Sequence, residues 1–461
     1  MSASYRDHVE SALAAGARFG GLYASADGTS VRAVLVGADG SLELENVAVV
    51  EGRVPTLVDL LPAADWDERE AADLYGIGFD GHEPLRPLVA HPAAPEAWTV
   101  PVHGDDAYQV AVGPIHAGII ESGHFRFHVV GDRILELDTR LFYKHRGLER
   151  AAEGRPLAAG LPYVARACAA CNVSNSVAYV QAAEQALGLR ASAGLARART
   201  LLLELERTWS HLNDIAAICA GAGLAAGEAF FSGLCERVRR LNHELSGHRL
   251  LFDSVQLGTS RLRLDRALVA HARAEIGEID AASRSGWREV LFNSSFQDRL
   301  PEIGVVSQAD ARSLGAVGPA ARASGVGEDA RCTASGLAYG EFVPVAPRRV
   351  AGDAQARLEQ RAVELLQCFE LLDELLDGAL EPAEAEPGGE GASLGHARVE
   401  SPRGATLCVV EQTGGRLERV HLRTGAYANW PVLAHAAAGN LLPDFPLINK
   451  SFELCYACAD R

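Results

Sequence analysis

The sequence predicts an α+β protein: a small N-terminal α+β domain, then a mainly helical bundle core with small peripheral β-sheets. Near the N-terminus, Val31–Val36 and Leu42–Val50 are β-rich runs separated by the turn sequence Gly37-Ala-Asp-Gly-Ser41. Later, Leu195–Cys219 carries apolar residues at the spacing of one helix face. A chain of 461 residues is too long for one ordinary core, so we expect more than one domain.

Three regions are expected along the chain. Residues 1–90 form the N-terminal α+β domain, in which Leu57–Asp73, rich in Ala, Leu and acidic residues, is predicted to be helical. Residues 91–108 contain a Pro- and Ala-rich passage typical of a linker. Residues 109–461 then form the main domain.

The main domain is predicted to combine short strands with long helices. Ser307-Gln-Ala-Asp310 has the spacing of a helix capping box. Glu381–Gly391 is polar and rich in Gly and Pro, which favours a loop, and Asn440–Arg461 has so little periodicity that we expect an irregular tail. The strands are expected over Phe125–Val130, Arg133–Asp138, Ala397–Glu400, Ala405–Glu411 and Arg416–Arg423, and the helices over Leu195–Cys219, Phe230–Phe252 and Ala354–Leu376.

Composition and charge exclude several classes of protein. The formal net charge of −17 argues against nucleic acid as a partner, because phosphate binding needs a basic face. The start of the chain, Met1–Glu10, lacks the basic and apolar segments of a secretory signal. The longest apolar stretches, such as Ile215–Ala226, are broken by Gly and too short to span a bilayer. Any membrane association is therefore expected to come through a partner.

The nine cysteines divide into two groups. An odd number without a signal peptide does not suggest a disulfide framework. Four cysteines form the pairs Cys168-Ala-Ala-Cys171 and Cys455-Tyr-Ala-Cys458. Five single cysteines in apolar surroundings are expected to be small buried hydrophobes: Cys219, Cys235, Cys332, Cys368 and Cys408.

A two-residue gap lets both sulfurs of a pair turn toward one metal ion. Thiolates are soft ligands that bind zinc, Cu(I), iron–sulfur clusters or nickel, and spacing alone favours zinc. The two pairs lie far apart in the chain, unlike those of a zinc ribbon, which indicates a buried centre in a large fold. Two unrelated reduced pairs or one structural zinc remain open as alternatives.

Arg166-Ala-Cys168-Ala-Ala-Cys171 and Cys455-Tyr-Ala-Cys458-Ala-Asp-Arg461 resemble the metal motifs of nickel–iron hydrogenase large subunits. Further segments resemble the energy-converting branch of that family, which includes the large subunits of formate hydrogenlyase and hydrogenase-4 and is homologous to the quinone-site subunit of respiratory complex I. Residues 65–88 resemble the small hydrophilic partner subunit of complex I, here fused at the N-terminus. The further segments are Gly113–Phe127, Tyr143–Glu149, Phe292–Leu300, Leu314–Gly325 and Asp444–Phe452.

The resemblance implies a nickel–iron centre held by all four paired cysteines. Cys168 and Cys455 would be terminal nickel ligands, and Cys171 and Cys458 would bridge nickel to an iron that carries CO and cyanide. The function implied is the reversible interconversion of H₂ with protons and electrons, which makes the chain an enzyme of the hydrogenase type.

The resemblance also implies roles for residues around the metals. Cys455 would accept a proton, Glu149 would be the first proton carrier, and Arg403, next to Pro402, would lie beside the ligands of the iron. The residues alone favour other interpretations: a solvated helix charge for Glu149 and a turn-capping surface residue for Arg403. His116, His124 and Asp214 match family motifs less specifically and are assigned to a path toward a membrane partner.

Partners are implied as well. No cysteines remain with the spacing of an Fe–S cluster, so electrons would pass to an Fe–S small subunit. Membrane-embedded antiporter-like subunits, and a formate dehydrogenase or other electron donor, complete the expected complex, which would lie on the cytoplasmic side of the cell membrane.

Three positions depart from the usual motifs of the family. Ala169 stands where Gly is usual, Asn175 where His is usual, and Glu453-Leu454 where Asp-Pro is usual. These departures motivate a second hypothesis, a complex I-like electron-transfer or quinone-site scaffold without hydrogen chemistry.

Overall fold

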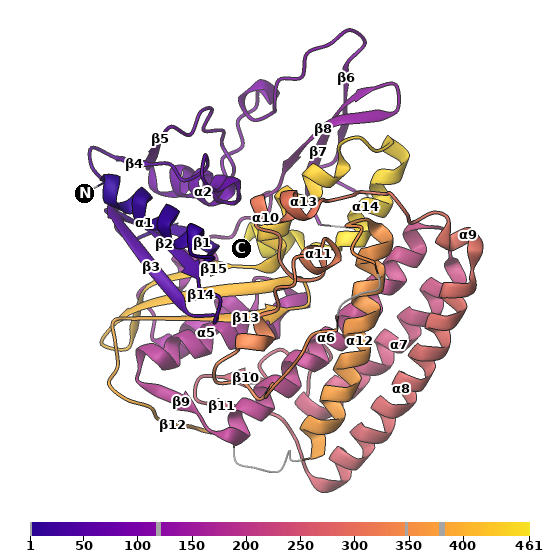
Figure 1. Cartoon of the computed structure of the whole chain (residues 1–461). Helices are drawn as coiled ribbons and strands as arrows, with labels where there is room; N and C mark the ends of the chain where they lie inside the picture. The colour runs from indigo at the N-terminus through magenta and orange to yellow at the C-terminus, as the bar shows by residue number, and fades with distance from the viewer. Residues whose placement is uncertain (1, 117–120, 346–348, 378–382) are drawn as a thin grey trace.

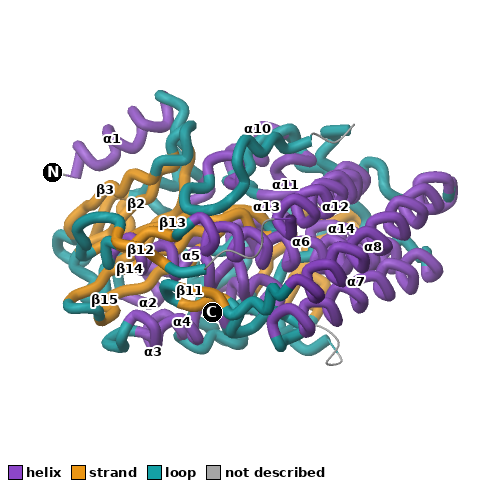
Figure 2. The backbone as a smooth tube through the Cα atoms, turned by 90° about the horizontal axis from the view of Figure 1, so that it is seen from below, coloured by secondary structure: helices purple, strands orange, loops and turns teal. Residues whose placement is uncertain are grey.

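The computed structural model describes residues 2–116, 121–345, 349–377 and 383–461. The small sheets lie toward one side of the molecule and the long helices toward the other (Figure 2). This arrangement confirms the predicted α+β class with a helical core and peripheral sheets. None of the described helices has the length and apolar character needed to cross a membrane.

The N-terminal region folds around an antiparallel sheet in the order β1-β2-β3, with a parallel pair, β4 and β5, beside it. Helix α2 begins at Asp65 and not at the predicted Leu57, because Pro62 starts a separate 3₁₀ turn, η1, and the amide of Leu57 donates to Glu68 instead (2.6 Å). The elements are α1 (Ser2–Ala14), β1 (Arg18–Ala24), β2 (Ser30–Val36), β3 (Leu42–Ala48), β4 (Arg53–Pro55), η1 (Pro62–Ala64), α2 (Asp65–Tyr75) and β5 (Gly78–Asp80).

Four long helices make the bundle on the opposite side (Figure 1). They are α6 (Ala193–Gly221), α7 (Ala225–Ser246), α8 (Arg266–Phe292) and α12 (Ala354–Asp377). Helix α6 is buried along most of its length, which places its charged side chains inside the protein. Helix α7 ends before the predicted Phe252, because Gly247 adopts a left-handed backbone (φ +84°) that stops the helix.

Five of the six strands in two further antiparallel sheets were predicted, and β6 was not. The sheet β6 (Tyr108–Val112), β7 (His124–Val130) and β8 (Arg133–Arg140) packs Phe125 and Phe127 against Phe445, with ring centroids 5.2 and 4.8 Å apart. The sheet β13 (Leu394–Ser401), β14 (Gly404–Thr413) and β15 (Arg416–Arg423) packs against helix α5 (Asn172–Ala186) and against the N-terminal sheet, where Tyr23 and Val34 meet Leu407 and Val409.

The prediction of an irregular tail over Asn440–Arg461 is wrong. The segment contains η5 (Leu442–Asp444), α14 (Phe445–Phe452) and α15 (Tyr456–Asp460), and it follows α13 (Gly425–Ala437). Pro446 does not break α14, because it lies in the first turn, where the missing N–H has no helical partner to lose. The buried residues of α14 and α15 pack into a core shared with β7 and β8.

The remaining elements are short. Ser307 caps α10 as predicted, since its hydroxyl accepts from the amide of Asp310 (3.1 Å). The predicted loop Glu381–Gly391 contains a short strand, β12, in its described part. The elements are η2 (Pro95–Ala97), α3 (Leu148–Ala152), α4 (Leu157–Ala165), η3 (Ala169–Cys171), β9 (Leu189–Ala191), β10 (Val255–Gln256), β11 (Thr259–Ser260), α9 (Ser294–Gln297), α10 (Gln308–Ser313), α11 (Gly318–Ala323), η4 (Ala330–Thr333) and β12 (Ala385–Pro387).

Candidate metal centre

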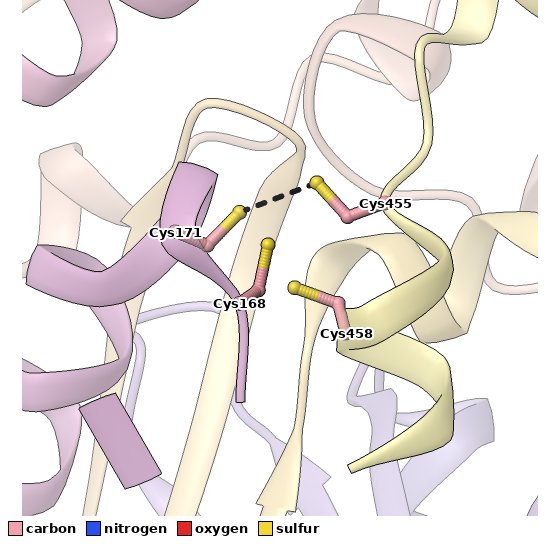
Figure 3. A group of neighbouring side chains, drawn as sticks. All are labelled: Cys168, Cys171, Cys455 and Cys458. Atoms are coloured by element: carbon pink, nitrogen blue, oxygen red, sulfur yellow. Dashed lines mark hydrogen bonds between the residues drawn. The ribbon is translucent and has the colours of Figure 1, made fainter. Parts of the chain in front are cut away.

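The fold brings the two cysteine pairs together. Cys168 precedes the turn η3 and Cys171 ends it, just before α5, whereas Cys455 precedes α15 and Cys458 lies within it (Figure 3). All four sulfurs lie within 4.8 Å of one another, and the Sγ atoms of Cys171 and Cys455 are 3.9 Å apart. A metal with bonds of about 2.3 Å to sulfur would hold tetrahedral thiolates about 3.8 Å apart. The geometry therefore fits a tetrathiolate metal site.

Each cysteine pair is positioned by a carboxylate from elsewhere in the chain. The first amides of α5 have no helical acceptor, and Glu206 on α6 accepts from those of Val173 (2.7 Å) and Ser174 (3.0 Å). At the other pair, Glu121 accepts from the amide of Ala457, between the two cysteines (2.7 Å). Both pairs are thereby anchored to the protein independently of any metal.

Hydrogen bonds within the cluster shift the pKa values of Cys168, Cys171 and Cys458 in different directions. Hydrogen bonds from the other three thiols hold the pKa of Cys168 well below its usual value. Hydrogen bonds to the ionised Cys168, together with burial, raise the pKa of Cys171 and Cys458 well above theirs. Four buried thiolates would repel one another strongly in a medium of low dielectric, so full ionisation of the cluster needs a cation.

A cavity of about 860 Å³ opens beside the cysteines. Its lining includes Cys168 and Cys455, together with Arg403, whereas Cys171 and Cys458 do not line it. Further basic side chains border the cavity: Arg239, His243, His248, Arg249 and Lys450.

Glu121 was not singled out by the sequence analysis. It lies in the Gly113–Phe127 segment, lines the same cavity as Cys455, and has a pKa raised chiefly by burial. A carboxyl group with a raised pKa that shares a cavity with a cysteine is a candidate for proton exchange with it. The sequence signal that could have identified Glu121 is its position two residues before Gly123-His124 in this segment.

Arg403 reaches the cysteines from the β13–β14 hairpin. Pro402 and Arg403 form its two-residue turn, and both are buried. The guanidinium donates to Asp214 (Nη2 to Oδ1, 2.8 Å) and to the main-chain oxygen of Glu453 (3.0 Å). Burial opposes the charge, but Asp214 and the neighbouring sulfur groups of Cys455 and Cys171 outweigh it and raise the pKa of Arg403. The turn arginine is therefore a buried cation beside the sulfurs.

Several buried polar groups around the cysteines lack a partner among the described residues, and two of them bear on the metal centre. These two are Nη1 of Arg403 and the side-chain amide of Asn175, whose nitrogen and oxygen are both unpaired. Asn175 lies one helical turn after Cys171 and is fully buried. Unpaired buried donors are costly, so these two groups fit a metal centre that carries hydrogen-bond acceptors.

Glu149 lies in a cluster of buried charges. It accepts from Arg419 (2.8 Å), Arg461 (2.9 Å) and the amide of Leu422 (2.9 Å). Burial raises its pKa, but the two guanidinium groups outweigh this effect and hold the pKa well below the usual value. Glu149 is thus neither a solvated helix charge nor a group poised to take up protons, and its proton-carrier role remains a prediction.

Other candidate residues are held by local contacts. Nε2 of His116 contacts the carbonyl oxygen of Gly123 (2.7 Å), and Nδ1 of His124 contacts that of Gly113 (3.2 Å). Asp214 is fully buried between Arg403 and Arg361. Of the single cysteines, Cys332 is exposed and not buried as predicted, because it lies in the short surface turn η4, whereas the other four are buried.

Comparison with known proteins agrees with the fold and with the predicted family. The family of the 49-kDa subunit of respiratory-chain NADH dehydrogenase matches residues 229–387, and that of the 30-kDa subunit matches residues 31–108. A membrane-bound sulfane sulfur reductase, described as an archaeal respiratory membrane complex, contains a chain of similar structure. The TM-score is 0.71 at 26% identity, over 77% of this chain and 99% of the other.

Individual curated relatives indicate a narrower family than these matches do. Formate hydrogenlyase subunit 5 of Escherichia coli K12 is 30% identical over 88% of this chain and 77% of its own length. The alpha subunit of the membrane-bound hydrogenase of Pyrococcus furiosus is 28% identical over 77% of this chain and 87% of its own length.

The fold and the family matches together define a large subunit of the class that membrane-bound hydrogenases share with respiratory NADH dehydrogenase. Within this class, the chain belongs to the family of formate hydrogenlyase subunit 5 and hydrogenase-4 component G, as the sequence motifs predicted.

Proposed function

We propose that this chain is the catalytic large subunit of a membrane-associated nickel–iron hydrogenase, which interconverts H₂ with protons and electrons. The observation that carries this proposal is the convergence of four thiolates within 4.8 Å in a member of a hydrogenase family. A nickel–iron centre, when bound, would supply the redox-active metals at which H₂ is cleaved or formed.

The residues around the thiolates suit such a centre. Cys168 and Cys455 line the cavity, which supports their assignment as terminal nickel ligands, and the deeper Cys171 and Cys458 suit the bridging positions. The unpaired Nη1 of Arg403 would donate to CO or cyanide on the iron. Pro402 lies in the same turn and would bind the centre together with Arg403, as the resemblance implies.

Protons need a route from the thiolates to solvent. Cys455 lines the cavity together with Glu121, so Cys455 would accept a proton and pass it to this carboxylate. The alternative carrier is Glu149, which two arginines hold in the ionised form. Comparing H₂ turnover in the Glu121→Gln and Glu149→Gln variants, each with the metal content of the wild-type complex, decides which residue carries the proton. If Glu121 is the carrier, its variant slows H₂ turnover by about 10²-fold or more, and Glu149→Gln much less.

Electrons need a partner subunit. Within the described residues no second cysteine cluster could hold an Fe–S centre. The basic side chains around the cavity suit the docking of an Fe–S small subunit that receives the electrons. Membrane-embedded antiporter-like subunits, with a formate dehydrogenase or another donor, would complete a complex on the cytoplasmic side of the membrane.

The fused organisation is part of the proposal. Residues 1–90 would form the small hydrophilic subunit-like domain, residues 91–108 the linker and residues 109–461 the hydrogenase domain. The matched 30-kDa family region ends at residue 108, which supports a boundary near β6.

The deciding experiment is metal analysis of the purified complex with a dye-linked H₂-uptake assay. We expect nickel and iron in about equal amounts, with H₂ uptake that is lost in Cys455→Ser. Fully assembled complex without nickel or H₂ uptake would contradict the proposal and favour the scaffold hypothesis. Stoichiometric zinc without activity would favour a structural zinc site.

A further inference from the structure

A buried ion cluster joins the N-terminal domain to the segment that carries Cys455 and Cys458. Helix α2 of the N-terminal domain presents Glu70, whose carboxylate contacts the guanidinium of Arg461. The same guanidinium donates from Nη1 to Glu149 (2.9 Å) and to the main-chain oxygen of Leu422 (2.7 Å). Arg461 therefore connects three separate parts of the chain.

Burial makes these contacts strong. The side chain of Arg461 is 5% exposed, and those of Glu70 and Glu149 are 10% and 14% exposed. Burial disfavours the charge on Arg461, but the two carboxylates outweigh this effect and raise its pKa. The ring of Tyr427 also lies 4.8 Å from the guanidinium carbon. A buried guanidinium with two carboxylates and a ring face has little freedom to leave.

Arg461 ends the segment that supplies half of the thiolates. Cys458 lies in α15, three residues before Arg461, and its main-chain oxygen accepts from the hydroxyl of Thr424 (3.2 Å). Asp460 accepts from the amides of Phe142 (2.7 Å) and Lys144 (2.9 Å). A helix of five residues is not stable alone, so these tertiary contacts fix its position.

We infer that the N-terminal domain is a positioning element of the metal centre, and that Glu70, acting through Arg461, holds the Cys455–Cys458 segment closed over the other two thiolates. The inference rests on the proposed metal site and adds a role to a domain that carries none of the four cysteines. Glu70 is a positioning residue, because it touches Arg461 and not the sulfurs.

A second contact between the same domains supplies a control. Arg32 and Tyr23 of the N-terminal sheet contact Glu411 on β14, at the strand end opposite the Arg403 turn. Arg32→Gln removes an ion pair between the domains without touching Arg461. Comparing it with Glu70→Gln separates a specific hold on the cysteine segment from general docking of the domain.

The test is hydrogen–deuterium exchange of the purified complex, with nickel retention measured after incubation with a chelator. In Glu70→Gln we expect the amides of residues 456–461 to exchange at least about tenfold faster and nickel to be lost faster, because removing one partner weakens a buried charge cluster. In Arg32→Gln we expect exchange changes confined to β2 and β14. Glu70→Asp should restore slow exchange and nickel retention, because it keeps the carboxylate.

Wild-type exchange and nickel retention in Glu70→Gln would overturn the inference. Equal acceleration of residues 456–461 in Glu70→Gln and Arg32→Gln would overturn it too, because docking as a whole would then hold the segment. Hydrogen–deuterium exchange of residues 456–461 can be measured whichever metal the complex contains. Absence of nickel from the wild-type complex would therefore defeat the proposed hydrogenase function, while the comparison of exchange rates still decides the role of Glu70.

Discussion

Asp214→Asn tests whether Arg403 is held beside the thiolates by a buried charge. Asp214 is fully buried on α6 and accepts from Arg403 (2.8 Å) and from Arg361 (3.1 Å). Asn has the same shape, so the change creates no cavity but leaves two buried guanidinium groups without their shared counter-charge. Removal of one partner from a buried ion pair costs about 3–5 kcal/mol. We expect a loss of unfolding free energy in that range.

The assay is urea unfolding of the metal-free chain, followed by tryptophan fluorescence, to which the buried Trp209 on the same helix contributes. Asp373→Asn is the matched control, because Asp373 pairs with Arg273 on the surface, and it should leave the transition unchanged. The double variant Asp214→Asn with Arg403→Gln removes both charges of the pair. Its cost should be smaller than the sum of the single costs by at least about 1 kcal/mol.

Two results would refute this reasoning. One is additivity of Asp214→Asn and Arg403→Gln, which would mean that the pair contributes no coupling energy. The other is unchanged H₂ turnover in the metal-loaded Asp214→Asn complex. Arg403 loses one of its two anchors in this variant, so turnover should fall more than metal content does.

Other substitutions test the cluster and its surroundings. Cys455→Ser should abolish metal occupancy, whereas Cys368→Ser, buried on α12 outside the cluster, should cost only modest stability; metal analysis and thermal unfolding check both. His82 lies between two carboxylates that outweigh its burial and raise its pKa to about 9, so its charge stabilises the folded state below about pH 6.5 and loses this effect as pH rises through 9. His82→Gln should therefore cost up to about 3 kcal/mol at pH 6 and little at pH 10, as unfolding midpoints across pH would show. Asn175→Leu removes an unpaired buried amide, so unfolding of the metal-free chain should show a stabilisation of about 1–2 kcal/mol. The same change removes a donor to the metal centre, so chelator challenge should show faster metal loss.

Local sequence signals predicted much of the fold. Apolar residues at helical spacing located α6 and α12 within two residues of their observed ends, and β-rich runs located the strands of the β13–β15 sheet. The motifs also identified the four cysteines that converge. These predictions succeeded because apolar periodicity and cysteine spacing depend only on residues close together in the sequence.

Long-range charge pairing could not be predicted in the same way. Arg403 pairs with Asp214, and Glu206 caps the start of α5. Both contacts join residues far apart in the chain, so local sequence patterns do not indicate them. Glu149 illustrates the difficulty. Its motif pointed to proton transfer, but its two arginine partners come from β15 and from the end of the chain. The two helical segments η5 and α14 were missed because Pro443 and Pro446 suggested irregular structure. Each proline lies in the first turn of its segment, where proline is compatible with a helix.

The site also argues against a purely structural zinc. Structural zinc sites are closed by four ligands, whereas catalytic centres keep an open side. Here Cys168 and Cys455 line a cavity of about 860 Å³, so one side of the cluster is accessible. Arg403 and Asn175 hold buried donors without a partner among the described residues, and each such donor costs about 1–3 kcal/mol when left unpaired. A centre that carries its own acceptor ligands and exchanges a small substrate accounts for both the opening and the donors.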